Sequence, residues 1–139
     1  MSDYVRKKAV RFKIDNAIVE SLEKEIEEKD LFESPQELLL KQYKLPDWFE
    51  HKLNKFTINN GYDFDNHKEN LFLDYMLDYE YGASGDFESV RLLTDNEFNK
   101  YRELFSKYFN VVRRDELRLV HYCYYNGVDE PSVWNLEKV

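Results

Sequence analysis

Apolar and polar residues alternate strictly near the start of the chain, in the segment AVRFKID at residues 9–15. Successive side chains of a β-strand point to opposite faces, so this period of two predicts a short strand with one buried face. The apolar positions of the segment are Val10, Phe12 and Ile14. The opposite face would consist of the alternate residues Lys7, Ala9, Arg11 and Lys13.

The apolar pattern changes its period after this strand. In residues 16–29 the residues Ile18, Leu22 and Ile26 recur every four positions, which predicts an amphipathic helix. Asp15 or Asn16 can cap this helix by accepting a hydrogen bond from an amide of the first turn.

A second helix is predicted to begin at the segment SPQE, residues 34–37. The Ser34 hydroxyl can accept a hydrogen bond from the third amide of the helix, and Glu37 can reach back to the Ser34 amide. Pro35 suits the first helical position, where its missing N–H leaves no bond unmade. Pro46 disfavours helical geometry in the residue before it and ends the helix near Leu45.

The rest of the chain predicts a mixture of helices and strands. Apolar residues at helical spacing predict a helix over residues 67–81, and a threonine–glutamate capping box predicts another that begins near residue 94. Alternation predicts strands at residues 89–93 and 117–125, and Asn-Asn-Gly at residues 59–61 predicts a turn. Asn126 and Gly127 predict a hairpin turn, after which Val133 and Trp134 either return along the strand or pack over the core.

The predicted fold class is therefore α+β. It consists of an N-terminal strand–helix–helix segment, residues 1–46, followed by a small mixed domain with a C-terminal β-hairpin, residues 47–139. A chain of 139 residues has room for one domain, or for two very small ones that share a core.

The charge of the chain is divided unevenly along its length. The formal net charge is −8, which argues against a broad basic surface that binds nucleic acid. The first thirteen residues, however, hold a single acidic residue, Asp3, against five basic residues: Arg6, Lys7, Lys8, Arg11 and Lys13. A basic segment joined to an acidic body is one pattern of a protein that contacts nucleic acid at one end.

The order strand, helix, capped turn and helix within residues 5–45 resembles the ribbon-helix-helix family of DNA-binding proteins. The matching segments are AVRFKID, NAIVESLEKEIEEK and SPQELLLKQYKL. The resemblance implies a homodimer whose N-terminal strands pair antiparallel and enter the major groove of double-stranded DNA. The function it implies is transcription regulation in a phage or other mobile element. The alternative is that these residues begin an ordinary α+β domain.

The resemblance also implies which residues contact DNA. The face that reads the bases would hold Lys7, Ala9, Arg11 and Lys13. Arg11 can bind guanine through two hydrogen bonds, and Lys13 can do so less rigidly. The start of the second helix, around Ser34 and Gln36, would lie near a phosphate, because free amides and the helix dipole favour an anion there.

A second hypothesis starts from residues 62–88, where Lys68 is the only basic residue among eight acidic ones. Carboxylates spaced along a surface can imitate a phosphate backbone, so this region would suit a small acidic inhibitor, similar to anti-CRISPR proteins in size and acidity. Its partner would be a basic nuclease or another nucleic-acid-binding protein of a bacterial defence system. The candidate contacts are Asp63, Asp65, Glu69, Asp74, Asp78 and Glu80. The simpler alternative is that the acidic charge serves solubility.

The sequence shows no motif for catalysis, metal binding or cofactor binding. It has no glycine-rich phosphate loop and neither of the paired motifs HxxxH and CxxC. His121 and Cys123 lie two residues apart on a predicted strand and are expected in the core. We therefore expect no enzyme activity, no cofactor and no metal. No apolar run reaches the roughly 18–20 residues of a membrane span, and a single cysteine fits the cytoplasm.

Overall fold

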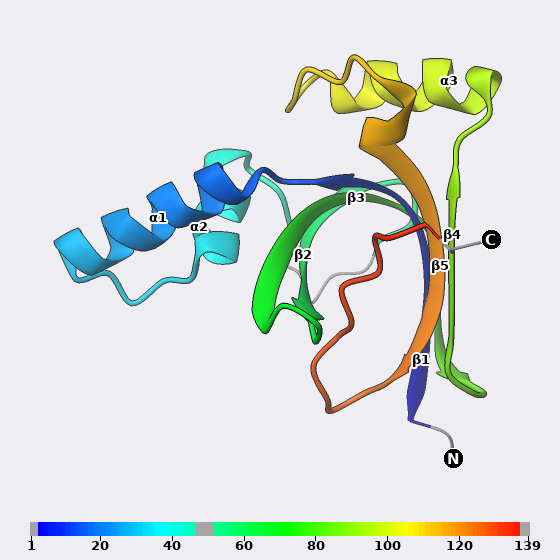
Figure 1. Cartoon of the computed structure of the whole chain (residues 1–139), viewed down its shortest axis with the longest axis horizontal. Coiled ribbons are helices and arrows are strands. Elements are labelled where there is room, and N and C mark those ends of the chain that lie inside the picture. Colours follow the sequence, from blue (N-terminus) through cyan, green and yellow to red (C-terminus); the bar gives the residue numbers. More distant parts are fainter. Residues whose placement is uncertain (1–2, 47–51, 137–139) are drawn as a thin grey trace.

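The computed structural model describes residues 3–46 and 52–136. Within them the chain forms a five-stranded antiparallel sheet with three α-helices, so the predicted α+β class is confirmed (Figure 1). The strands are β1 (Tyr4–Lys13), β2 (Phe56–Asp63), β3 (Lys68–Ala83), β4 (Phe87–Leu92) and β5 (Leu117–Tyr125), in the spatial order β2-β3-β1-β5-β4. The helices are α1 (Asn16–Lys29), α2 (Pro35–Gln42) and α3 (Asp95–Phe105), and a 3₁₀ turn spans Arg114–Glu116.

The N-terminal strand β1 lies in the middle of the sheet. It pairs antiparallel with β3 on one side and with β5 on the other. Both rows of its backbone groups are used within the chain, so β1 offers no free edge to a second copy. This strand therefore does not form the intermolecular ribbon of the ribbon-helix-helix family. The predicted division into residues 1–46 and 47–139 also separates strands of a single sheet.

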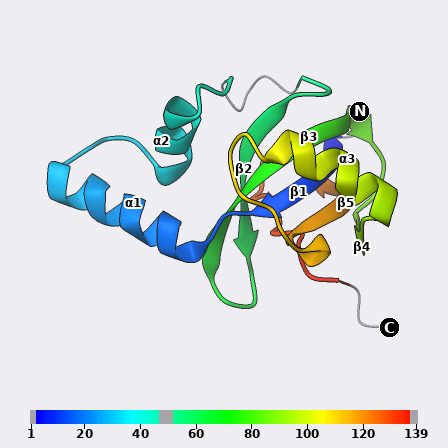
Figure 2. The same ribbon diagram turned by 90° about the horizontal axis from the view of Figure 1, so that it is seen from above.

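Both faces of β1 are covered, and the predicted alternation is confirmed. Val10 and Ile14 point into a core that includes Leu117 of β5 and Phe105 of α3. Figure 2 shows α3 lying across the sheet. Ala9 points to the opposite face. The core on that face consists of Ala9, Met76, Val120, Tyr122 and Val133.

The second core is closed by the last part of the described chain, residues 126–134, here called the C-terminal segment. It runs along the concave side of the bent sheet (Figure 1). The predicted hairpin is wrong, because β4 takes the place beside β5. The segment instead reaches β2, where the Tyr62 amide donates to the Glu130 carbonyl at 2.7 Å and the Ser132 amide donates to the Tyr62 carbonyl at 2.9 Å. Val133 is buried, so the alternative prediction that it packs over the core is confirmed.

Two elements in the middle of the chain are predicted wrongly. The helix expected over residues 67–81 is the long strand β3. Residues 71–74 of β3 are all buried, so its apolar pattern lacks the simple alternation of a half-exposed strand. The turn expected at residues 59–61 lies inside β2, and the chain turns at residues 64–67 instead. Gly61 has another role there, because a Cβ atom on it would lie 2.8 Å from the carbonyl oxygen of Pro131.

The predicted helix starts are confirmed. The Asp15 carboxylate accepts a hydrogen bond from the Ala17 amide at the start of α1, and the Ser34 hydroxyl accepts one from the Glu37 amide at the start of α2. At α3 both bonds of the capping box between Thr94 and Glu97 are present. These caps are local features, so neighbouring residues suffice to specify them.

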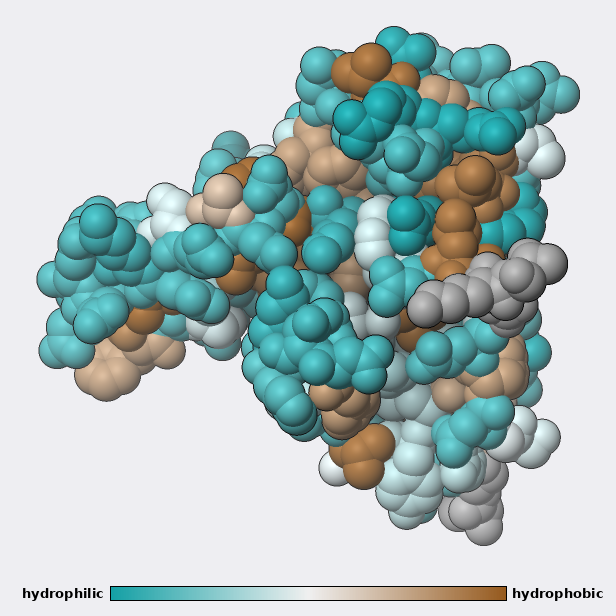
Figure 3. Space-filling view, viewed as in Figure 1, coloured by the Kyte–Doolittle hydropathy of each residue, from teal (hydrophilic) through white to brown (hydrophobic). Residues whose placement is uncertain are grey.

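Helices α1 and α2 form an arm that projects from one side of the sheet (Figure 1). Val19 is the buried residue of α1, whereas Leu39 and Leu40 anchor α2 in the first core. Phe32, in the turn between the two helices, is fully exposed. Figure 3 shows a mostly hydrophilic arm with apolar surface near its outer end.

Candidate functional site

The residues expected to read DNA lie on the concave side of the sheet, beneath the C-terminal segment. Lys7, Ala9 and Arg11 expose only 3%, 1% and 1% of their surface. The expectation that they form an exposed base-reading face is therefore not met. The strand pattern correctly places them on one face, but the C-terminal segment covers that face. Lys13, near the end of β1, remains partly exposed.

Arg11 is held by a buried ion pair with Asp74 of β3. Its Nε and Nη2 donate to the two oxygens of the Asp74 carboxylate, each at 2.8 Å. The same guanidinium donates to the Val133 carbonyl at 2.9 Å and to the Tyr122 hydroxyl at 2.8 Å, and Asn59 donates to Asp74 at 2.5 Å. Burial alone would lower the pKa of Arg11, but the Asp74 carboxylate raises it above the ordinary value. Asp74 thus pairs inside the protein and is not the exposed partner contact expected for it.

The buried network extends to the C-terminal segment through Glu130. Lys7 donates to both oxygens of the Glu130 carboxylate, at 3.0 and 3.1 Å. The Tyr122 hydroxyl also donates to this carboxylate. Burial raises the pKa of Tyr122 well above its ordinary value, so its hydroxyl stays protonated as a donor. These bonds fasten the C-terminal segment to β1 and β5, which is a structural role.

The other acidic candidates occupy three different places. The Asp63 carboxylate accepts hydrogen bonds from Asn66 and from the Asp65 amide, and these bonds, Asn66 first, lower the pKa of Asp63. Asp65 is exposed in the same turn. Asp78 and Glu80, near the far end of β3, both pair with Arg6, at 2.7 and 2.8 Å. Among the described residues, neither this turn nor this end of β3 holds a cluster of unpaired carboxylates.

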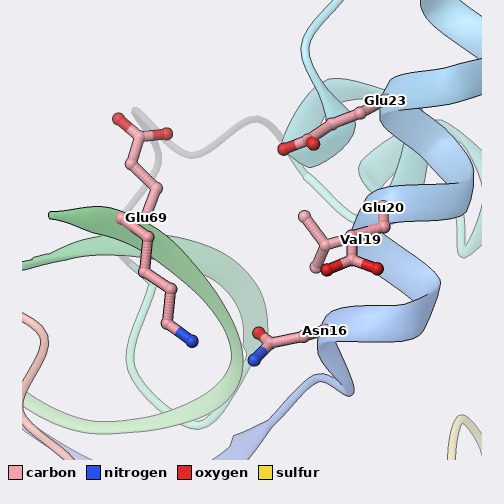
Figure 4. A pocket seen from close by; sticks show the side chains of 6 residues that line it. Asn16, Val19, Glu20, Glu23 and Glu69 are labelled. Carbon is pink, nitrogen blue, oxygen red and sulfur yellow. The ribbon is translucent and has the colours of Figure 1, made fainter. Parts of the chain in front are cut away.

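Glu69 belongs to a cluster that the sequence reasoning did not assemble. It lines a cavity of about 340 Å³ between α1 and the start of β3, together with Glu20 and Glu23 of α1. Figure 4 shows the two α1 glutamates on one side of this cavity and Glu69 on the other. The remaining lining residues are Asn16, Val19 and Lys68. We call this cavity the acidic groove.

The carboxylates of the acidic groove are not neutralised by ion pairs. Among the described residues, none of Glu20, Glu23 and Glu69 has a cationic group within ion-pair distance. Asn60 donates to Glu69 at 3.4 Å. Among the residues that the structure describes, no three potential metal ligands come close enough together to hold a metal ion.

The start of α2 lies beside this groove. Ser34 and Gln36 line a small neighbouring cavity of about 50 Å³, which shares Glu23 and Glu69 with the acidic groove. The side-chain Nε2 of Gln36 also donates to the Ile58 carbonyl of β2. Two carboxylates repel a phosphate, so this position does not suit the phosphate contact expected for Ser34 and Gln36.

Glu20 and Glu23 were missed because the groove forms only in three dimensions. In the sequence they are two of many glutamates on the polar side of a helix, which is the ordinary pattern of a solvated face. Glu69 is separated from them by more than forty residues and by the whole of α2 and β2. The only signal in the sequence was that both glutamates lie off the apolar stripe that Ile18, Leu22 and Ile26 form on the helix at residues 16–29, which places them at the surface.

Cys123 is buried in the core, as expected, whereas His121 on the same strand is only partly buried. Burial raises the pKa of the Cys123 thiol, whereas an activated nucleophile needs a lowered pKa. The buried Cys123 lies two positions after His121 in β5, so both side chains point to the same face of the strand. The His121 ring contacts the Phe87 ring edge-on, with 5.0 Å between the ring centres.

No protein-family model matches this chain, and neither does any curated protein or solved structure. Within the described part of the chain, none of the helices has the length and apolar composition needed to cross a membrane.

Proposed function

We propose that this protein binds a basic segment of a partner protein through the acidic groove. The observation that carries the proposal is that Glu20, Glu23 and Glu69, from two separate elements, line one cavity together with a single basic residue, Lys68, and have no ion-pair partner among the described residues. Unpaired carboxylates facing one cavity produce a negative potential that attracts a cationic ligand. Arginine and lysine side chains are the cations that proteins present at such sites, and arginine binds carboxylates through two parallel bonds.

The partner class that fits best is a protein with a nucleic-acid-binding surface. Such surfaces carry clustered Lys and Arg side chains that bind phosphates, and a carboxylate cluster competes for the same side chains. The protein would then act as an inhibitor that occupies the basic channel of a nuclease or another nucleic-acid-binding protein. Reading of DNA by β1 is not proposed, because the polar face of this strand is covered by the C-terminal segment.

The helical arm adds an apolar contact to this surface. Phe32 at the turn of the arm is fully exposed, and α1 carries the groove residues Glu20 and Glu23. Aromatic side chains are common anchors in protein interfaces, and charges near them guide the encounter between the partners. The arm therefore carries an exposed aromatic side chain at its turn and, in α1, two of the three carboxylates of the acidic groove.

The groove is tested first with a defined basic probe, an oligo-arginine peptide titrated into the isotopically labelled protein. We expect saturable changes in the amide signals of residues 16–23 and 68–69. The variant Glu20→Lys/Glu23→Lys/Glu69→Lys should weaken binding about ten-fold or more, because it reverses the charge of the site. The matched control is Glu88→Lys/Glu103→Lys/Asp129→Lys, which changes the net charge equally at exposed acidic residues elsewhere. Equal weakening by both variants would show that only the net charge matters, and the groove would be rejected.

The partner class is tested by capturing proteins from a bacterial lysate and measuring the binding of each purified candidate. We expect a nucleic-acid-binding protein whose complex is lost in the groove variant and retained in the control variant. Double-stranded DNA should compete with the complex, because both ligands use the same cations. A partner whose binding is insensitive to DNA would contradict the proposed blocking of a nucleic-acid channel.

A further inference from the structure

A third cavity, of about 430 Å³, lies where β1 ends and α1 begins. Asn16 lines both this cavity and the acidic groove, so the two sites flank the start of α1. Its charged lining residues are three basic ones, Lys13, Arg113 and Arg118, and three acidic ones, Asp15, Asp115 and Glu116. We call this cavity the cationic pocket, after Lys13 and Arg118.

Among the described residues, two cationic side chains in this pocket, Lys13 and Arg118, have no carboxylate within ion-pair distance. Arg118 lies over the Trp134 ring at 4.1 Å and donates to the Trp134 carbonyl, and its Nε atom is buried without a hydrogen-bond partner. A buried donor that lacks a partner costs free energy, so an acceptor at this position would be stabilising.

Burial opposes the charged form of both cations. It is the largest cause that lowers the pKa of Lys13 below its ordinary value; Lys68 and Arg118 add to it, while Asp63 and Asp15 act in the opposite direction. Burial likewise lowers the pKa of Arg118, against the opposing effect of Asp115. An anion beside the two side chains would favour their charged forms.

The three carboxylates of the pocket are already engaged. Asp115 holds Arg113 at 3.1 Å, and the Asp15 carboxylate caps α1 through the Ala17 amide. The Glu116 carboxylate accepts hydrogen bonds from the amides of residues 112 and 113, at 3.0 and 2.7 Å. Lys13 and Arg118 are therefore the groups left to meet a ligand.

We propose that the cationic pocket binds the phosphate group of a small phosphomonoester, with Lys13 and Arg118 as the groups that contact the phosphate oxygens. The volume exceeds that of a phosphate alone and falls in the range of small-molecule sites. The rest of the ligand would lie against Phe12 and the aliphatic part of Ile14. This site is separate from the acidic groove and does not depend on the function proposed for it.

The test is an NMR titration of the labelled full chain, in a buffer free of phosphate, with three probes: inorganic phosphate, adenosine 5′-monophosphate and phosphoserine. We expect saturable changes in the amide signals of Lys13, Asn16 and Arg118. Binding of either phosphomonoester should be tighter than binding of inorganic phosphate, and the tighter of the two identifies the source of the phosphate group. Absence of saturable changes at these amides with all three probes overturns the proposal.

Variants assign the binding to the two cations. Lys13→Gln should weaken the binding of the tighter probe about ten-fold, since a hydrogen bond to a charged group is lost. Arg118→Lys keeps the charge but removes the two-pronged donor, and it should weaken binding as well. Lys55→Gln is the control, an exposed lysine outside the pocket. If Lys13→Gln and Lys55→Gln bind equally, the proposed site is wrong, and the spectra themselves report whether each variant is folded.

Discussion

At the scale of single residues, Arg11 shows how a correct pattern can lead to a wrong role. The alternation in residues 9–15 places Arg11 on the polar face of a strand, and that assignment holds. A basic residue on a strand face suggests a ligand outside the protein, but Asp74, sixty-three residues away, supplies the partner from within. Buried charges occur almost only in such pairs, because an unpaired buried charge is very costly.

Removal of one member of this pair should be more damaging than removal of both. Asp74→Leu leaves Arg11 buried without its carboxylate and should cost roughly 3–5 kcal/mol in the free energy of unfolding. The double variant Arg11→Met/Asp74→Leu removes both charges and should be more stable than Asp74→Leu alone. Urea unfolding followed by circular dichroism measures the two single variants Asp74→Leu and Arg11→Met, the double variant and the parent. Additive costs of the two substitutions would contradict a direct coupling between them.

At the scale of elements, features that depend on neighbouring residues were predicted correctly, whereas a strand buried on both faces was not. The caps of α1, α2 and α3 depend on residues within four positions of one another, and all three are confirmed. The strand β3 was expected to be a helix, because its long apolar stretch is buried on both faces and loses the period of two. The pattern of apolar and polar residues indicates which side chains are buried, but it does not indicate which element covers each face of a strand.

The capping box of α3 makes a prediction about pH. Arg91 donates to the Glu97 carboxylate at 2.8 and 3.0 Å, and with the Thr94 amide it lowers the pKa of Glu97 to about 2, from an ordinary value of 4.5. Glu97 therefore stabilises the fold above pH 4.5, and this contribution is lost as the pH falls toward 2.

The variant Glu97→Gln isolates this contribution, because glutamine keeps the hydrogen-bonding shape but not the charge. We expect it to be less stable than the parent at pH 7, by roughly 0.5–1 kcal/mol. The difference should shrink through the acid range and vanish near the pKa of about 2. Glu103→Gln, on the exposed side of the same helix, should show no difference at either pH. A gap between Glu97→Gln and the parent that is constant from neutral to acid pH would rule out this carboxylate as its source.

At the scale of the whole molecule, the N-terminal strand and the C-terminal segment pack together. The C-terminal segment lies on the polar face of β1 and bonds to it through Arg11 and Lys7. This contact decides that Lys7 and Arg11 of the N-terminal strand are internal. The candidate site follows from the same arrangement, because β3, placed beside β1, brings Glu69 opposite α1.

Two valines of the C-terminal segment can be used to measure how much this contact contributes to the free energy of unfolding. Val133 exposes 1% of its surface and Val128 exposes 59%. Val133→Ala removes buried methyl groups from the second core and should lower the free energy of unfolding by about 2 kcal/mol. Val128→Ala makes the same chemical change at the surface and should have an effect within about 0.5 kcal/mol. Equal stabilities of the two variants in urea would show that the segment does not hold the core closed.

The sequence by itself determined the α+β class, the strand at the N-terminus with its two distinct faces, and the starts of three helices. Each depends on residues that are close along the chain, where hydrogen bonds and periodic burial are specified locally. Only the tertiary structure decided that β1 is central, that Asp74 pairs with Arg11, and that Glu20 and Glu23 meet Glu69. These contacts join residues dozens of positions apart. Their formation depends on which strands pair and on what covers each face, and no local pattern contains that information.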